Sequence, residues 1–365
     1  MRGTRGPASL SRTFNPTMLA LARESRGETQ SGLARTIGIT QGHISRIEAG
    51  QSPASDAIIS DVVDALGYPE HFFFMDEPVY GPGVSEFFHR KHNTSTKVLN
   101  RMHANLNVRR IHVARLMAAA ELNSENIPRL NPRDFGSPEA VARAIRSTWN
   151  LPPGPVEDLT SAVEDAGGIV LHCDFGTRDV DGVSRWIPGL PPMFFLNRDM
   201  PGDRMRLTLA HELGHVVMHR APRPEMEEEA YSFGRELLMP EDEIRPHFQR
   251  VTVHSLAEMK PFWRVSMAAL LYCAGELGAI SERQRRTLYM QLGSRGFRRQ
   301  EPPELDVPIE KPTLLQEIVQ MHQNDLGYTV DELADLLALK TEEMLSLYDV
   351  TMTHEERRRR LRAVG

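Results

Sequence analysis

The sequence predicts a mainly α-helical protein with one small β-sheet (α+β), built from more than one domain. Three observations lead to this fold class. The chain has 365 residues, enough for two or three domains. Apolar residues recur with helical spacing through most of it. Only residues 167–197 change period, with the short β-prone runs "GGIVLHCDF" and "PPMFFLN" bounded by glycine, proline and aspartate.

Composition is that of a soluble globular protein. Apolar residues make up 40% and charged residues 25% of the chain. No apolar run reaches the ~18 residues of a membrane span, and "MRGTRGPASLSRTF" lacks the apolar core of a secretory signal. Cys173 and Cys273 are the only cysteines, too few for a disulfide framework. We expect a cytoplasmic protein without membrane contact, with Cys173 as a small buried apolar residue.

Charge is unevenly distributed, although the net charge is only −6. Residues 1–50 carry seven Arg against three Glu, and residues 84–150 carry eleven Lys or Arg against five Asp or Glu. Residues 301–350 carry two Lys against twelve Asp or Glu, a net charge of −10. A polyanion is therefore expected to bind the first half of the chain.

Breaks rich in proline and glycine divide the chain into predicted segments. "DEPVYGPG", "RLNPRDFGSPE" and "RRQEPPELDVPIEKP" are such breaks. We predict a disordered tail (1–14), an all-α N-terminal domain (15–76), a linker and helical region (77–131), a central domain containing the sheet (132–300), an acidic helical domain (301–350) and a charged tail (351–365).

Residues 27–50 predict two short helices joined by a tight turn. Thr29 is placed to cap the first helix, Gly38 supplies the turn, and Thr40 is placed to cap a second helix over 41–49. This is the pattern of a helix-turn-helix, in which the start of the second helix enters the major groove of DNA.

The second helix exposes polar side chains that suit base edges. Gln41 suits a bidentate bond to adenine, and Arg46 suits guanine or a phosphate. Gln30, at the start of the first helix, is placed to touch the DNA backbone. The candidate DNA-binding residues are Gln30, Thr40, Gln41, His43, Ser45 and Arg46.

The stretch "LARTIGITQGHISRIEAGQSPAS" resembles the Xre/Cro-type repressor helix-turn-helix family, and the match covers about residues 15–75. The resemblance implies a domain that binds a double-stranded DNA operator. Because such operators are two-fold symmetric, we expect a homodimer. A domain of five helices that binds protein in place of DNA is the alternative.

An internal repeat joins the two ends of the chain. "GETQSGLARTIGITQGHISRI" (27–47) aligns without gaps to "GYTVDELADLLALKTEEMLSL" (327–347), so the second copy has a helix-turn-helix core. Its surface is acidic where a phosphate-binding face is neutral or basic; the residues are Asp331, Glu332, Asp335, Glu342 and Glu343. We interpret it as a structural or partner-binding copy. Chance similarity of two amphipathic helix pairs is the alternative.

The stretch "RLTLAHELGHVVMH" has the spacing of a metal site. On a predicted helix over 203–219, His211 and His215 lie one turn apart and point the same way. Two imidazoles so placed suit one Zn²⁺ ion. Glu212 is rotated by about 100° from His211, beside the ion and not on it, where it suits the role of general base.

A third ligand is expected on the helix that follows. His219 lies eight residues beyond His211, ~12 Å along a helix axis, which is too far for a shared ion; it suits a supporting contact, a helix cap or a substrate contact. Glu227 falls about 60° from Ala230, within the apolar face of the next helix. We predict Glu227 as the third ligand, with Glu229 as the second choice.

The pair "DRMRLTLAHELGHVVMH" and "EEEAYSFGRELLMP" resembles the ImmA/IrrE family of metallopeptidases, over roughly residues 135–295. The resemblance implies a zincin-like domain that holds Zn²⁺ by two His and one Glu, with Glu212 as general base. Tyr231 departs from the family pattern, since relatives usually show Asn or Asp there, so the support of a ligand histidine differs here. The oxyanion donor stays open among Tyr231, His172 and His219.

Together these features favour a DNA-binding transcriptional regulator with a zinc-dependent endopeptidase domain. The resemblance implies cleavage of a specific regulatory protein, such as a repressor, in a stress or mobile-element response. We expect the substrate to bind as an extended peptide along a strand within 180–197.

Two alternatives stay open. One is a non-proteolytic DNA-binding repressor whose metal site is a sensor. The other is an antitoxin-like regulator that binds a partner protein through the acidic C-terminal region. An intact Glu212 favours catalysis over sensing, because holding a metal does not require it.

Overall fold

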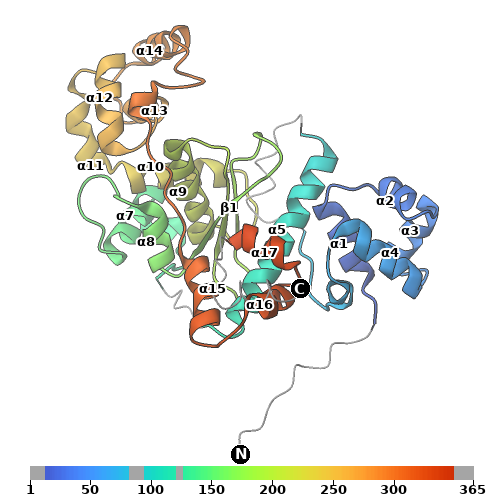
Figure 1. Ribbon diagram of the computed structural model, residues 1–365. Coiled ribbons are helices and arrows are strands. Elements are labelled where there is room, and N and C mark those ends of the chain that lie inside the picture. Colours follow the sequence, from blue (N-terminus) through green and yellow to red (C-terminus); the bar gives the residue numbers. More distant parts are fainter. Residues whose placement is uncertain (1–12, 82–93, 121–125, 349–365) are drawn as a thin grey trace, which may run out of the picture. The chain divides into compact units, whose positions relative to one another are not determined.

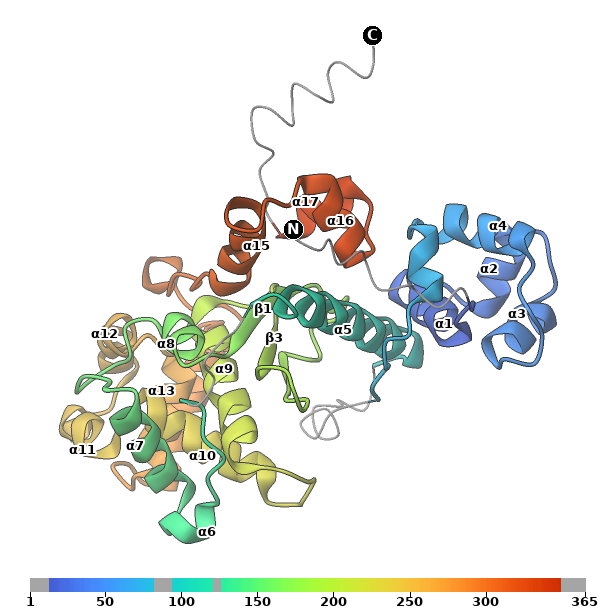
Figure 2. The ribbon, with the colours of Figure 1, turned by 90° about the horizontal axis from the view of Figure 1, so that it is seen from below.

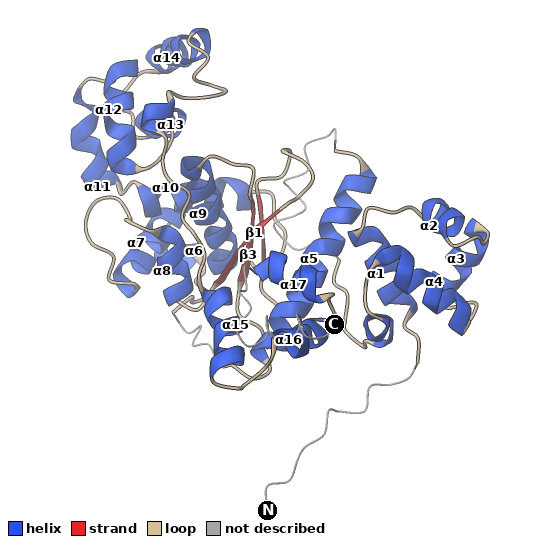
Figure 3. Cartoon of the chain, in the orientation of Figure 1, coloured by secondary structure: helices blue, strands red, loops and turns tan. Residues whose placement is uncertain are grey.

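The computed structural model describes residues 13–81, 94–120 and 126–348 (Figures 1 and 3). The predicted fold class is confirmed, since helices dominate and three strands form one sheet. The chain forms two compact units. Unit 1 comprises residues 1–82, 93–121 and 315–365, and unit 2 comprises residues 83–92 and 122–314. The predicted tail 351–365, and all but the last two residues of the predicted tail 1–14, lie outside the described residues.

The N-terminal part of unit 1 is a small helical bundle (Figure 2). Its elements are α1 (Pro16–Ser25), α2 (Gln30–Thr36), α3 (Gln41–Glu48), α4 (Asp56–Leu66) and the 3-10 helix η1 (Glu70–Phe74). Thr29 caps α2 by accepting from the Gly32 amide, and Thr40 caps α3 by accepting from the His43 amide. Gly38 between them has a φ of 73°, which glycine adopts without strain. The predicted helix-turn-helix is confirmed.

Unit 1 is completed by one long helix and by the end of the chain. These elements are α5 (Thr96–Met117), α15 (Leu314–Asn324), α16 (Val330–Leu337) and α17 (Thr341–Tyr348). Helix α5 packs against both α1 and α16. Arg26, at the end of α1, makes a bidentate ion pair with Glu343 of α17, at 2.6 and 2.7 Å. The acidic C-terminal helices are thus packed within unit 1, against the helical bundle and α5.

In the segment that the repeat covers, α16 and α17 are joined by a tight turn at Ala338, and its interpretation as a second helix-turn-helix core stays a prediction. Thr329 caps α16 by accepting from the Glu332 amide, as Thr29 caps α2. Ala338 takes the place of Gly38 and adopts the same left-handed conformation, with a φ of 52°. A residue with a Cβ is strained there by ~1–2 kcal/mol, so packing holds the turn of the second copy in a shape that the first copy adopts freely.

Buried His112 gives unit 1 a pH-dependent stability. Its Nδ1 lies 2.6 Å from the hydroxyl of Tyr348, and burial, then the charges of Arg109 and Arg115, lowers the pKa of His112 well below 6.5. The unfolded chain keeps a pKa near 6.5 and binds more protons in acid, so unit 1 should lose stability as the pH falls below about 6.5.

The measurement for His112 is hydrogen-exchange protection of the α5 amides at about pH 5 and about pH 7. His112→Leu should flatten the pH dependence of protection. His254→Gln, on a side chain that is 85% exposed, is the matched control and should not change it. An unaltered slope in His112→Leu would contradict the assignment.

The sheet lies in unit 2. Its strands are β1 (Ile169–Cys173), β2 (Gly182–Arg185) and β3 (Met193–Asn197). The central strand β3 is parallel to β1 and antiparallel to β2, so β2 is an edge strand. Strands β1 and β3 confirm the predicted β-prone runs. The β-prone runs identified in the sequence do not include strand β2, because "GVSR" is short and has no alternation of apolar residues.

The other described elements of unit 2 are helices. They are α6 (Pro132–Phe135), α7 (Pro138–Thr148), α8 (Leu159–Asp165), α9 (Gly202–Met218), α10 (Met226–Leu238), α11 (Glu241–Ile244), α12 (Val253–Trp263), α13 (Met267–Glu276) and α14 (Glu282–Ser294), with 3-10 turns η3 (Arg245–Gln249) and η4 (Pro303–Leu305). Helix α9 packs on β2 and β3, and α10 packs between α9 and α7. Side chains such as Phe194, Leu209 and Phe233 form the core between them.

The segment 301–314, here called the strap, is bound to the rest of unit 2 although its prolines predicted a linker. Glu301 accepts a hydrogen bond of 2.6 Å from the buried ammonium of Lys260. Glu310 forms an ion pair with the buried guanidinium of Arg206. The strap is therefore held in place by acidic side chains that neutralise two buried cations. The prolines, on which the linker prediction was based, do not indicate these ion pairs.

Candidate functional site

The close approach of α9 and α10 builds the site. A Cβ on Gly214 would lie 3.2 Å from the Cα of Ala230, and a Cβ on Gly234 would lie 3.1 Å from the backbone nitrogen of His211. A Cβ at either position would push the neighbouring helix away by a few tenths of an ångström, so the two glycines let the helices pack this closely. As α9 runs from 210 to 214, its contacts on α10 run from 234 to 230, so the helices are antiparallel.

This packing brings three ligand atoms together at one point. The Nε2 atoms of His211 and His215 are 3.0 Å apart. Glu227 places its carboxylate oxygens 3.4 Å from the first of these nitrogens and 3.2 Å from the second. Ligands bonded at ~2.0–2.1 Å to a tetrahedral zinc ion are ~3.4 Å apart. The three residues, here called the His-Glu cluster, therefore fit a zinc ion.

A chain of hydrogen bonds runs behind His215. Its Nδ1 lies 2.9 Å from Nδ1 of His219, and Nε2 of His219 lies 2.9 Å from the carboxylate of Glu229. If Nε2 of His215 faces an ion, its proton must sit on Nδ1 and is donated to His219, which in turn donates to Glu229. Burial, then the charges of His215 and Arg223, lowers the pKa of His219 to about 3, so its ring stays neutral and can accept.

Glu229, the second choice for the third ligand, thus contacts His219 and not the His-Glu cluster. Glu229 also pairs with Arg223 in the loop before α10. Sequence spacing placed Glu229 at the edge of the apolar face. Nothing in the spacing indicated that His219, at the C-terminal cap of α9, would turn back to meet it.

Glu212 lies on the sheet side of α9. It is fully buried, and its Oε2 accepts a 2.7 Å hydrogen bond from the hydroxyl of Ser184 on β2. A Cβ on Gly182 would lie 2.6 Å from Cγ2 of Thr208 on α9, so this glycine lets the edge strand reach the helix. Sequence reasoning missed Ser184 because it missed the strand that carries it.

The two other candidates for an oxyanion donor lie on different elements. Tyr231 is one turn beyond Glu227 on α10 and packs edge-on against Tyr272, with ring centroids 5.0 Å apart; burial raises the pKa of its phenol. His172 lies on β1, on the far side of β3 from β2, and burial lowers its pKa. Within the described residues, neither side chain hydrogen-bonds to the His-Glu cluster.

The candidate DNA-binding residues gather on α2 and α3 of unit 1. Thr40, Gln41 and Arg46 are exposed, and Gln30, His43 and Ser45 are half-buried. Gln41 donates a 2.8 Å hydrogen bond to Gln30, which donates one of 2.8 Å to Glu48. Arg23 fixes Glu48 through two hydrogen bonds of 2.6 and 2.9 Å. The first residue of α3 is therefore held in one orientation before DNA arrives, which lowers the entropic cost of binding.

Replacing Gln41 by Ala is expected to relax operator specificity at one base pair by ~1–3 kcal/mol, because the amide can no longer pair with a base edge. An operator selected from a random DNA pool and its single-base variants would be titrated by fluorescence anisotropy. Gln291→Ala, an exposed glutamine of α14 in unit 2, is the control. An unchanged specificity profile in Gln41→Ala would show that Gln41 reads no base.

Fold and site define a class of protein. Unit 1 carries a DNA-binding helix-turn-helix, and unit 2 carries a metallopeptidase-like domain with a candidate His/Glu metal site. The chain matches the helix-turn-helix family model at residues 19–73 and the IrrE N-terminal-like domain, a peptidase family, at residues 163–274. Both resemblances predicted from the sequence are thus confirmed, in the same order along the chain.

Three further observations complete the description. No curated protein matches the chain. Within the described residues, none of the helices combines the length and the apolarity that crossing a membrane requires. Both cysteines are buried, and burial raises the pKa of the Cys273 thiol to about 12.

Proposed function

We propose that this protein is a cytoplasmic DNA-binding regulator whose second unit is a zinc-dependent endopeptidase that cleaves a specific regulatory protein. The His-Glu cluster beside Glu212 is the observation that carries the proposal. The domain order supports it, because a peptidase on the same chain as an operator-binding domain acts where transcription is controlled. Cleavage of a repressor in a stress or mobile-element response, and a homodimer on a two-fold operator, belong to the same proposal.

In this proposal His211, His215 and Glu227 hold Zn²⁺. Bound zinc would lower the pKa of a water molecule and polarise the scissile carbonyl. Glu212 takes the proton of the attacking water and passes it to the leaving amine. Ser184 orients the Glu212 carboxylate, and His219 with Glu229 fixes the His215 ring in the tautomer that leaves Nε2 free to bind a metal.

The edge strand β2 gives the substrate a place to bind. It is an edge strand of the described sheet, and the hydroxyl of its Ser184 hydrogen-bonds to Glu212. An extended peptide that adds to β2 through main-chain hydrogen bonds would therefore lie beside the general base. His172, on the far strand β1, is a poor candidate for the oxyanion donor in this arrangement.

The test of the metal site is zinc stoichiometry by elemental analysis. The purified protein is expected to hold about one zinc ion per chain. Glu227→Ala should lose it or weaken its binding by at least about tenfold, and His219→Ala should retain it with about 10–100-fold lower affinity. Glu228→Ala, an exposed neighbour on α10, is the control. A native protein that binds no zinc after reconstitution would end the peptidase proposal.

A further inference from the structure

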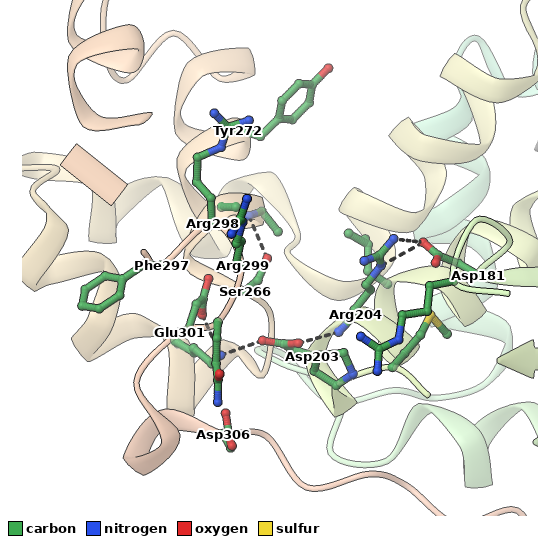
Figure 4. A pocket seen from close by; sticks show the side chains of 18 of the residues that line it. Asp181, Asp203, Arg204, Ser266, Tyr272, Phe297, Arg298, Arg299, Glu301 and Asp306 are labelled. Carbon is green, nitrogen blue, oxygen red and sulfur yellow. Dashed lines mark hydrogen bonds and ion pairs between the residues drawn. The ribbon is translucent and has the colours of Figure 1, made fainter. Parts of the chain in front are cut away.

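Unit 2 contains a cavity of about 650 Å³ (Figure 4). One wall is made by the start of α9 and by the segments on either side of β2 and β3, with Asp181, Arg204 and Leu207. The other wall is made by α12–α14 and the residues that lead into the strap, with Tyr272, Tyr289, Arg298 and Arg299. This volume is in the range of ligand pockets and holds one large side chain with its neighbours.

The cavity is next to the proposed metal centre. Leu207 lies four residues, one turn, before His211 on α9, and Tyr231 lies four residues after Glu227 on α10; both line the cavity. One turn is ~6 Å along a helix. An extended peptide advances ~3.3 Å per residue. A substrate residue one or two positions from a scissile bond at the His-Glu cluster would therefore reach the cavity.

Part of the charge on these walls is already neutralised. Arg204 holds Asp181 at 2.6 Å, and Lys260 holds both Asp203 and Glu301 at 2.6 Å. Figure 4 draws such contacts as dashed lines, among them those between Asp181 and Arg204. These paired charges are therefore not free to bind a ligand.

The remaining groups that line the cavity indicate which class of ligand it suits. Aromatic surface is provided by Tyr231, Tyr272, Tyr289 and Phe297. Within the described part of the chain, Arg298 and Arg299 have no carboxylate within ion-pair distance, and Asp199 and Asp306 line the cavity as well. A cavity that presents aromatic rings and charges of both signs suits a peptide, which can offer an apolar and a charged side chain side by side.

We propose that this cavity selects the peptide substrate. It takes a large aromatic or apolar side chain one or two positions from the scissile bond, and Arg298 and Arg299 bind an acidic residue beside it. This inference rests on the proposed peptidase function.

The test measures peptide binding by the zinc-loaded, full-length Glu212→Gln protein. Three fluorescein-labelled peptides with Gly-Ser flanks differ only in a central pair: Phe followed by Glu, Ala followed by Glu, and Phe followed by Lys. Fluorescence anisotropy should show the first peptide binding at least about tenfold more tightly than either other peptide.

Variants of the cavity wall identify the two contacts. Ala268→Phe fills the cavity from α13 and should remove the advantage of Phe over Ala. The double variant Arg298→Glu, Arg299→Glu should remove or reverse the preference for Glu over Lys. Arg295→Glu, exposed and outside the cavity, is the matched control for charge. Zinc content and melting temperature should be unchanged in all of them.

The outcomes separate the two proposals. Equal affinity for the three peptides, or preferences that persist in both cavity variants, would overturn the cavity assignment. Incubation of the native zinc-loaded protein with a mixture of synthetic peptides, read by mass spectrometry, tests the peptidase alone. Selective binding without any cleavage would keep the cavity as a peptide site and reject the peptidase function. Cleavage without the predicted preference would keep the peptidase function and reject the cavity as the site that selects the peptide.

Discussion

Replacing Glu212 by Gln is expected to abolish peptide-bond cleavage while zinc content and operator binding stay at native levels. The amide has the same size and can still hydrogen-bond with the hydroxyl of Ser184, which lies 2.7 Å from the carboxylate. It cannot accept the proton of the attacking water, and loss of a general base lowers rates by ~10²–10⁴. Mass spectrometry of a peptide mixture incubated with zinc-loaded protein would measure the loss.

The control for this variant is Glu228→Gln. Glu228 is an exposed carboxylate in the first turn of α10, so its loss removes the same charge without touching the proposed machinery. Cleavage that survives in Glu212→Gln would show that another group accepts the proton. Loss of zinc together with cleavage would instead show that Glu212 is needed to assemble the site.

A second large effect is expected when Lys260 is replaced by Met. Its ammonium is buried and lies 2.6 Å from both Asp203, in the first turn of α9, and Glu301 of the strap. Met has nearly the same length but leaves both carboxylates buried without their cation. Breaking one partner of a buried ion pair costs ~3–5 kcal/mol, so we expect unit 2 to lose about that much stability.

Tryptophan fluorescence can follow this loss, because all three tryptophans of the chain, Trp149, Trp186 and Trp263, lie in unit 2. Urea unfolding curves of native and Lys260→Met protein would give the difference. A triple variant that also carries Asp203→Asn and Glu301→Gln should recover most of the stability, since no buried charge then lacks a partner. A Lys260→Met protein as stable as the native one would show that water reaches these carboxylates.

Local patterns predicted those parts of the fold that local physics determines. Thr29 and Thr40 cap the helices as expected, since a side-chain oxygen that satisfies a free amide is a short-range effect. The placement of Glu227 followed from helical rotation, and the structure brings it within 3.4 Å of both histidine nitrogens. Its role as a ligand stays a proposal that the zinc measurement tests.

These local patterns did not predict the long-range contacts of the site. The bond from Ser184 to Glu212 depends on a strand too short and too polar to show alternation. The contact between His219 and Glu229 depends on how α10 returns along α9, which the close approach at Gly214 and Gly234 decides. No spacing of residues in the sequence encodes such a return.

The strap determines where the peptidase-like unit ends along the chain. The family match ends at residue 274, yet Arg206 relies on Glu310, and Lys260 relies on Glu301. Beyond these, Glu164 of α8 accepts the amides of residues 313 and 314. A fragment that stops at residue 300 would leave buried Arg206 without the carboxylate of Glu310, and would leave Lys260 with Asp203 alone. We therefore expect the smallest fragment of this unit that folds alone to extend through residue 314. Its strap supplies, as part of the same chain, the carboxylates that neutralise the buried cations.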